Sequence, residues 1–435
     1  MRLIQTLSMA SMLMFVASST FASDIAITGG KVITMGKGGT LENATVLIKD
    51  GKITKVGVGI SVPNGYEIID ANGKWVTPGF MGASTSLGLN EGPSWAGVDD
   101  SDASKAEVGA SLDVTWALNP AQSPFAINRI EGITRAATNI VKSKTLFSGQ
   151  GAVISLGDDG KVYKSKVYMN LAVDEEASRL LSGRSSVWHS VITAFDEAEK
   201  HIEALKKKAE DDMKPKTDQD DCEKSQEEEE KPNPDRDALE LVVKGELILV
   251  VSASRKADLL NVIRLGEKYP NLKIVISGGQ EAWMVADKLA QANIGVIVHP
   301  IDNLPQSFDM LGATQQNAGR LEKAGVKVAI VGNGDANVRL AVQNAGNAVA
   351  NGMSWQGAMA SLTTVPAEMF GISDSYGTLE AGKDADVVVW DGDPLELMTS
   401  PDAVIISGEN IPLVSRQTKL RDRYKDITRS PAYVK

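Results

Sequence analysis

Cysteine and histidine are both scarce in this chain of 435 residues. There is one cysteine, Cys222, and there are three histidines, His189, His201 and His299. A single cysteine excludes an intramolecular disulfide and any zinc site built from several thiolates. Three histidines leave little material for a metal centre with many imidazole ligands. Positive charge is also in deficit, and the net charge of −11 argues against nucleic acid and anionic membranes as partners.

The remaining composition is typical of a globular protein. Hydrophobic residues make up 43% of the chain and charged residues 23%, which is ample apolar material for a core. The length allows one large α/β barrel or two to three ordinary domains. Beyond the N-terminus there is no run of about 20 apolar residues, so we expect no membrane insertion.

Residues 1–22 have the pattern of a secretory signal peptide. Arg2 supplies a positive start, an apolar stretch around Leu13–Val16 follows, and Thr20 and Ala22 are small residues at the positions that precede cleavage. No cysteine follows that could carry a lipid anchor. This pattern predicts export to a bacterial periplasm; the alternative is a weak N-terminal helix of a cytosolic protein.

The two ends of the mature chain share a β-strand character. Short apolar runs fill residues 24–76, and the Asp50-Gly51 pair between two of them is a strong hairpin signal. A similar pattern returns over 376–415. We therefore predict one composite β-sandwich formed by residues 23–77 and 376–415.

Between these ends, residues 78–375 alternate between strand-like and helical patterns. Such βα units predict an α/β fold with a TIM-type (β/α)8 barrel. The expected strands are 80–84, 133–140, 152–156, 167–172, 246–252, 273–277, 295–299 and 326–332, and the clearest helices are 190–208, 256–268, 281–292 and 314–324.

One segment of the barrel region is of low complexity. Residues 206–237 contain 13 acidic and 8 basic residues, including four consecutive glutamates. This composition predicts a solvated, disordered insertion, although a role in binding cations or a partner stays open. The tail over 416–435 is basic and polar, and we expect it to fray.

Two motifs carry a resemblance to a known family. The N-terminal motif is Gly73-Lys-Trp-Val-Thr-Pro-Gly-Phe80, and the C-terminal one runs from Thr363 to Ile372 and on through Gly382-Lys-Asp-Ala-Asp386 to Pro394. Both resemble the amidohydrolase superfamily, and the match is closest to exported, imidazolonepropionase-like members. The resemblance implies a distorted (β/α)8 barrel with a composite β-sandwich. It also implies one or two divalent metals, zinc or another, that activate water against carbon–nitrogen bonds.

The positions that bind metal in this family are occupied by serine here. The His-x-His at the end of barrel strand 1 corresponds to Ser84 and Ser86, and the histidines of strands 5 and 6 correspond to Ser252 and Ser277. Only Asp335 matches the family pattern, as the aspartate after strand 8 that is ligand and general base. Because serine hydroxyls are poor zinc ligands, we expect no bound metal cofactor.

Other residues are candidates for the pocket at the carboxyl ends of the strands. These are His299, Gln280 and Arg339, of which Arg339 could pair with Asp335 or bind an acidic ligand. Structural roles are the alternative: His299 is predicted to cap its strand rather than to bind a ligand, and Asp335 could cap its loop. Glu281, in the first turn of an expected helix, is predicted to cap that helix.

Three functions remain open from the sequence. The first is a hydrolase of carbon–nitrogen bonds other than peptide bonds, weakly active or inactive without metal. The second is a pseudoenzyme that binds a small-molecule ligand, and the third is a partner subunit of an active amidohydrolase. A homo-oligomer is compatible with each of them.

Overall fold

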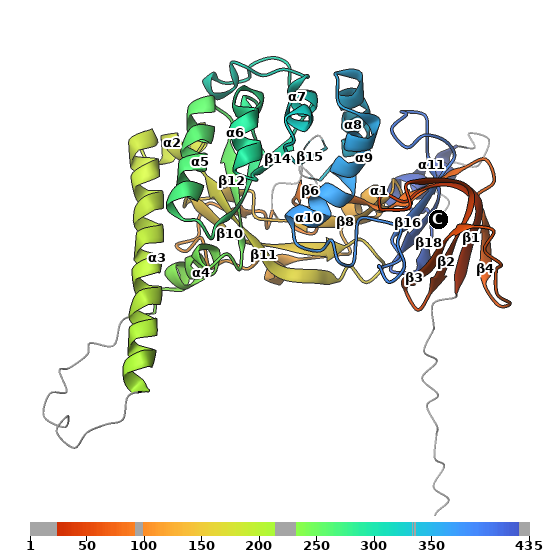
Figure 1. Cartoon of the computed structure of the whole chain (residues 1–435), viewed down its shortest axis with the longest axis horizontal. Coiled ribbons are helices and arrows are strands. Elements are labelled where there is room, and N and C mark those ends of the chain that lie inside the picture. Colours follow the sequence, from red (N-terminus) through yellow and green to blue (C-terminus); the bar gives the residue numbers. More distant parts are fainter. Residues whose placement is uncertain (1–23, 92–98, 214–231, 333, 335, 426–435) are drawn as a thin grey trace, which may run out of the picture.

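The structure is a computed structural model that describes residues 24–91, 99–213, 232–332, 334 and 336–425. The predicted signal peptide, Cys222, most of the acidic insertion, Asp335 and the end of the tail lie outside the described residues. The described chain forms a barrel surrounded by helices, with a second sheet at one end (Figure 1).

Eight strands form the barrel sheet, as the sequence predicted. In spatial order they are β6 (Phe80–Thr85), β8 (Ile133–Thr138), β10 (Phe147–Ser155), β11 (Val162–Ala172), β12 (Ile248–Ala253), β13 (Lys273–Gly278), β14 (Gly295–Val298) and β15 (Val328–Ile330). The last strand, β15, lies beside the first, β6, but the described residues make no ladder between them. The barrel is therefore nearly closed.

One strand departs from the parallel arrangement that we expected. β10 runs antiparallel to both of its neighbours, β8 and β11, whereas the other neighbouring pairs are parallel. No helix lies between β8 and β10 or between β10 and β11. Strands joined by such short connections must reverse direction, because a parallel pair needs a long crossover.

Side chains alternate between the two faces of the barrel sheet. One buried cluster takes residues from all eight strands, including Val250, Val275 and Ile297, and fills the interior. Their neighbours, such as Leu249 and Ile276, belong to a second cluster together with the surrounding helices. This period of two is the pattern of strands that are buried on both faces.

The helices lie mostly after the parallel strands. They are η1 (Val114–Ala117), α1 (Ser123–Arg129), α2 (Glu175–Leu180), α3 (Arg184–Asp212), α4 (Pro234–Val243), α5 (Lys256–Lys268), η3 (Ala282–Val285), α6 (Ala286–Gln291), η4 (Phe308–Met310), α7 (Asn317–Lys323), α8 (Leu340–Ala350), α9 (Trp355–Leu362), α10 (Thr364–Met369) and α11 (Arg416–Tyr424). Two short strands, β7 (Asp102–Ala103) and β9 (Lys142–Ser143), pair with each other outside the barrel.

The second sheet joins the two ends of the chain. It contains β1 (Ile25–Ile33), β2 (Thr40–Lys49), β3 (Lys52–Val58), β4 (Glu67–Asp70), β5 (Trp75–Pro78), β16 (Val387–Trp390), β17 (Pro401–Ile406) and β18 (Glu409–Ile411). The predicted hairpin is confirmed, with positive φ at Asp50 and Gly51 between β2 and β3. The ends thus form one eight-stranded sheet, while their arrangement as a sandwich stays a prediction.

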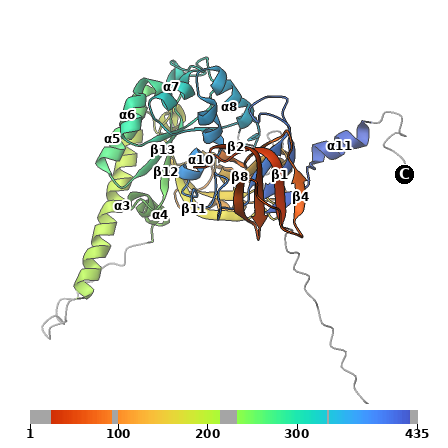
Figure 2. The same ribbon diagram turned by 45° about the vertical axis from the view of Figure 1, so that its right-hand side comes forward.

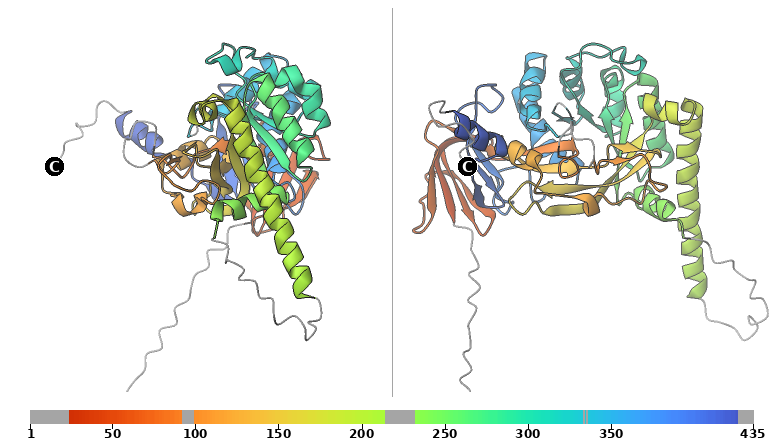
Figure 3. Two further views of the ribbon diagram at one scale, coloured as in Figure 1. Left: turned by 90° about the vertical axis from the view of Figure 1, so that its left-hand side faces the viewer. Right: turned by 180° about the vertical axis from the view of Figure 1, so that it is seen from behind.

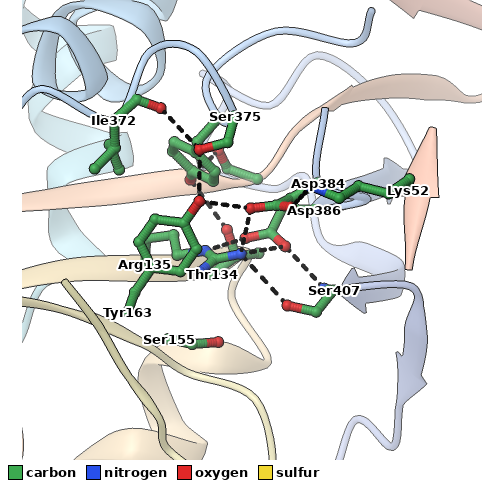
Figure 4. Close-up of polar contacts among 12 residues, drawn as sticks. Lys52, Thr134, Arg135, Ser155, Tyr163, Ile372, Ser375, Asp384, Asp386 and Ser407 are labelled. Carbon is green, nitrogen blue, oxygen red and sulfur yellow. Dashed lines mark hydrogen bonds and ion pairs between the residues drawn. The ribbon is translucent and has the colours of Figure 1, made fainter. Parts of the chain in front are cut away.

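A buried ion-pair cluster connects the barrel to this sheet (Figure 4). Arg135 on β8 is 1% exposed, and its Nε donates to Asp386 Oδ2 at 2.7 Å. Asp384 lies beside it and accepts from Tyr163 Oη at 2.8 Å and from Lys52 Nζ at 2.6 Å. Ser407 donates its backbone N–H to Asp386 at 2.8 Å. Both aspartates belong to the Gly382–Asp386 motif, so this motif has a packing function at the junction.

Two segments that we expected to be irregular are partly helical. The prediction of a fraying tail is wrong for Arg416–Tyr424, because Ser415 and Thr418 form a capping box that starts α11 (Figure 2). Helix α3 includes residues 206–212 of the acidic segment and extends beyond the barrel (Figure 3). In the described part of the chain, no helix is long and apolar enough to cross a membrane.

Candidate functional site

Serines lie at the carboxyl ends of the barrel strands, where folds of this class carry their chemistry. Ser252 on β12 and Ser277 on β13 lie side by side, as partners in the register of two parallel strands. Each follows an interior valine by two residues, so both point to the inside of the barrel. Ser84 is half-buried in β6, and Ser86, just after β6, is fully buried and accepts a weak hydrogen bond from Asn90.

Two further candidates, His299 and Gln280, come together through Asp302, which lies in the loop after β14. Asp302 Oδ1 lies 2.8 Å from His299 Nδ1, and Asp302 Oδ2 accepts from Gln280 Nε2 at 2.9 Å. His299 follows interior Ile297 by two residues, so the group lies at the end of β14 on the inner side. Asp302 therefore orients both side chains at the barrel mouth.

The pKa of the Asp302 carboxyl reflects this position. Burial raises its pKa, but the hydrogen bonds from His299 and Gln280 and the charge of His299 outweigh burial, so that its pKa falls below the usual 3.8. The ionised carboxylate is thus the stable form near neutral pH, and it can hold the imidazole in one orientation.

We expect the Asp302→Asn variant to lose a pH-dependent part of its stability. A lowered folded-state pKa contributes stability above the unfolded-state value of 3.8, and this contribution disappears as the pH falls through the folded-state pKa. At pH 7 the free energy of unfolding, measured with urea, should therefore be larger for the wild type than for Asp302→Asn. This difference should narrow as the pH falls from about 5 to below 3.8. A gap that is constant over this range would contradict the assignment.

Glu281 caps a different helix from the one predicted. Its Oε2 accepts from the backbone N–H of Lys256, the first residue of α5, at 2.7 Å, and its Oε1 accepts from Gly312 N–H at 2.9 Å. Glu281 is 7% exposed. Glu281 caps α5 because the turn after β13 places its carboxylate against the start of that helix. The same carboxylate thereby joins α5 to the loop after β14.

The remaining predicted residues do not join this group. Asp335 lies outside the described residues. Arg339 lines a small cavity of about 180 Å³ together with Glu131 and Leu395, and its backbone N–H donates to Asn128 at 2.8 Å. The structure thus brings Arg339 to the junction with the second sheet and not to His299.

A polar pair inside the barrel was missed by the sequence analysis. Tyr168 Oη donates to Asn139 Oδ1 at 3.1 Å, and both residues are buried. Burial raises the pKa of Tyr168 well above its usual value, so the phenol stays neutral. Both residues fall inside expected strands, 133–140 and 167–172, and the strand pattern assigned neither of them a further role.

The side chains at the mouth do not fit a divalent metal of the type that the resemblance implies. The described strand ends offer serine hydroxyls, amides, one imidazole whose Nδ1 is held by Asp302, and the Asp302 carboxylate, whose two oxygens are occupied by His299 and Gln280. Within the described ranges, the one group of three metal-binding side chains is His201, Asp237 and Glu240, on α3 and α4 outside the barrel. Zinc requires about four nitrogen, sulfur or carboxylate ligands, and the described mouth does not supply them.

Comparison with known proteins supports the fold and the family. The structure of an amidohydrolase from Thermotoga maritima MSB8 is similar, with a TM-score of 0.79 and 24% identity over 90% of this chain and all of that one. Molinate hydrolase gives a TM-score of 0.55 with 17% identity, covering 95% of this chain and 99% of that one.

A curated relative and a family model match the sequence itself. The amidohydrolase tasK of Hapsidospora irregularis is 23% identical over 394 residues, which is 83% of this chain but only 39% of that protein. The model of the amidohydrolase family matches residues 189–414. That match covers more than half of the sequence, and this chain belongs to the amidohydrolase family.

Proposed function

We propose that this chain is a periplasmic member of its family whose barrel mouth binds a small molecule without a catalytic metal. By family it is a hydrolase of carbon–nitrogen bonds other than peptide bonds, and we propose that its own hydrolytic activity is weak or absent. The composite β-sandwich and the cleavage after Ala22 are parts of the same proposal. The pattern of residues 1–22 supports export.

One observation carries the proposal: Ser252 and Ser277 are paired in register, on the inner face, at the two strand ends where the family has histidines. Hydroxyl groups donate and accept hydrogen bonds but are poor ligands for zinc. Together with Gln280 and His299 they form a polar lining suited to an uncharged amide, lactam or similar group. Asp302 holds His299 in place, and we propose that any residual water activation uses Asp335 as the base.

We expect elemental analysis to find less than about a tenth of an equivalent of zinc, manganese, iron or nickel per chain. The protein should be purified without metal-affinity resin and measured beside His201→Ala. This control is needed because His201, Asp237 and Glu240 form a separate group that could hold an ion. Metal that disappears in this variant belongs to that group, whereas a full equivalent that persists contradicts the proposal.

A panel of amides, dipeptides and lactams tests the activity. A carboxylate base alone provides about 10²–10⁴-fold acceleration, so we expect turnover at or below that level and unaffected by chelators. Asp335→Asn should abolish whatever turnover remains. Fast turnover that a chelator removes would show that a metal enzyme is present after all. Ligands from the same panel should raise the melting temperature without being consumed.

A second function, as partner subunit of an active amidohydrolase, is favoured by the loop after β14. Leu304, Phe308 and Leu311 on this loop are 75%, 83% and 63% exposed. The loop is nevertheless held in place, because Asp309 pairs with Arg184 and Gly312 is bound by Glu281. A fixed loop with exposed apolar side chains is typical of a protein interface.

Substitution of Leu304 and Phe308 by serine tests this second function. We expect the double variant to lose co-purification with an active amidohydrolase of the native host, measured by native mass spectrometry. The matched control is Leu397→Ser, since Leu397 is 73% exposed on a different loop. Recovery of the wild type as a pure homo-oligomer would count against pairing.

A further inference from the structure

A wide cavity lies at the opposite end of the barrel from the serines. It has a volume of about 1090 Å³ and opens where β12, β13 and β14 begin, at Ile248, Lys273 and Gly295. Helices α5, α6 and α10 form its walls. We call it the basal groove. Its volume is slightly above the usual range for small-molecule sites, which is about 300–1,000 Å³.

The floor of the basal groove is apolar. Ile263, Ile274, Ile294, Met369 and Phe370 line it. All five are mostly buried, and the first four keep between 5% and 8% of their surface exposed. Buried core side chains therefore form the bottom of this opening, and only small parts of their surface are exposed to it. Such a floor gains free energy from contact with an apolar ligand, at about 0.8 kcal/mol per buried methylene group.

The rim of the groove is cationic. Six basic residues line it, against three acidic ones: Lys164, Lys166, Arg264, Lys273, Lys288 and Lys327, against Glu246, Glu267 and Glu368. Glu368 is already paired with Lys327 at 3.0 Å. Lys273 and Lys288 are exposed, and neither has an ion-pair partner within the described ranges of the chain. This local excess of positive charge is opposite to the net charge of −11.

We propose that the basal groove binds an amphiphilic anion, a molecule with an extended apolar chain and one carboxylate or phosphate head. The floor would take the chain, and Lys273 and Lys288 would face the head. Since the groove and the serines lie at opposite ends of the barrel, this binding does not depend on the function proposed for the mouth.

Isothermal titration calorimetry with delipidated full-length protein tests the proposal. The ligands are dodecanoate and dodecyl phosphate, each used below its critical micelle concentration. Both should bind, and the tighter of the two identifies the head group. Octanoate should bind at least about tenfold more weakly than dodecanoate, because four methylene groups are missing. Equal binding of dodecyltrimethylammonium or of inorganic phosphate alone would overturn the proposal, as would no binding of either twelve-carbon anion.

The variant Lys273→Glu/Lys288→Glu tests the rim. Reversal of two charges should weaken dodecanoate binding about tenfold, and the loss should shrink at high salt. The control is Lys419→Glu/Lys425→Glu, which makes the same change in net charge on and beside α11. Because Lys273 and Lys288 are exposed, the melting temperature should stay unchanged. Unchanged affinity in the groove variant, or an equal loss in the control, would contradict the assignment.

Discussion

Replacement of Arg135 by methionine should lower the free energy of unfolding by about 3–5 kcal/mol. The guanidinium is 1% exposed and lies against two carboxylates, Asp384 and Asp386, of which Asp386 is 2% exposed. Methionine fills a similar volume but leaves the buried Asp386 without a cation, whereas Asp384 keeps its ion pair with Lys52. Urea unfolding at neutral pH measures the loss, and the second sheet should detach from the barrel early in the transition.

The matched control is Arg179→Met. Arg179 pairs with Glu175 one turn away on α2, but its side chain is 74% exposed. Surface pairs of this kind contribute about 0.3–0.5 kcal/mol, so the control should be close to wild type. If both variants lost the same free energy of unfolding, the burial of Arg135 would not explain the loss in Arg135→Met. An Arg135→Met protein as stable as the wild type would show that the buried Asp386 does not depend on this ion pair.

The second large effect is expected for Phe195→Ala, with a loss of about 3–5 kcal/mol. Phe195 on α3 is fully buried between Phe147 and Tyr269, with ring centroids 5.7 Å and 5.4 Å away and edge-to-face geometry in both pairs. Its removal leaves a cavity where α3 contacts both β10 and the end of α5. Thermal unfolding followed by circular dichroism would measure the change.

Phe308→Ala is the control for this prediction. It deletes the same side chain from a position that is 83% exposed, so the change should stay within about 0.5 kcal/mol. The two variants thus separate burial from residue type. A similar loss in both would contradict the role given to the aromatic contacts around α3.

Much of the fold followed from the sequence because apolar runs mark strands directly. All eight barrel strands and the Asp50-Gly51 hairpin were predicted. The antiparallel direction of β10 was not, because alternation of side chains does not depend on which way a strand runs. Arg135 was also missed: its partners lie about 250 residues away in the sequence, and no local pattern connects them.

The site was predictable where it depends on position along a strand. The family resemblance placed Ser252 and Ser277 at the ends of two barrel strands, and the structure puts them side by side. Asp302 was missed as the residue that joins Gln280 to His299, since this contact depends on the path of two loops. The basal groove was missed for the same reason, because its lining comes from the starts of strands that are far apart in the sequence.

The composite sheet also sets the order in which the chain can complete its fold. β5 pairs with β1 along one edge, and its other edge pairs with β16, from Trp75↔Trp390 to Pro78↔Val387. Until β16 has been synthesised, this edge has unpaired backbone groups beside the buried Val76. Such an edge is a template for aggregation. Nascent or truncated chains that end before Val387 are therefore the forms of this protein that most need a chaperone.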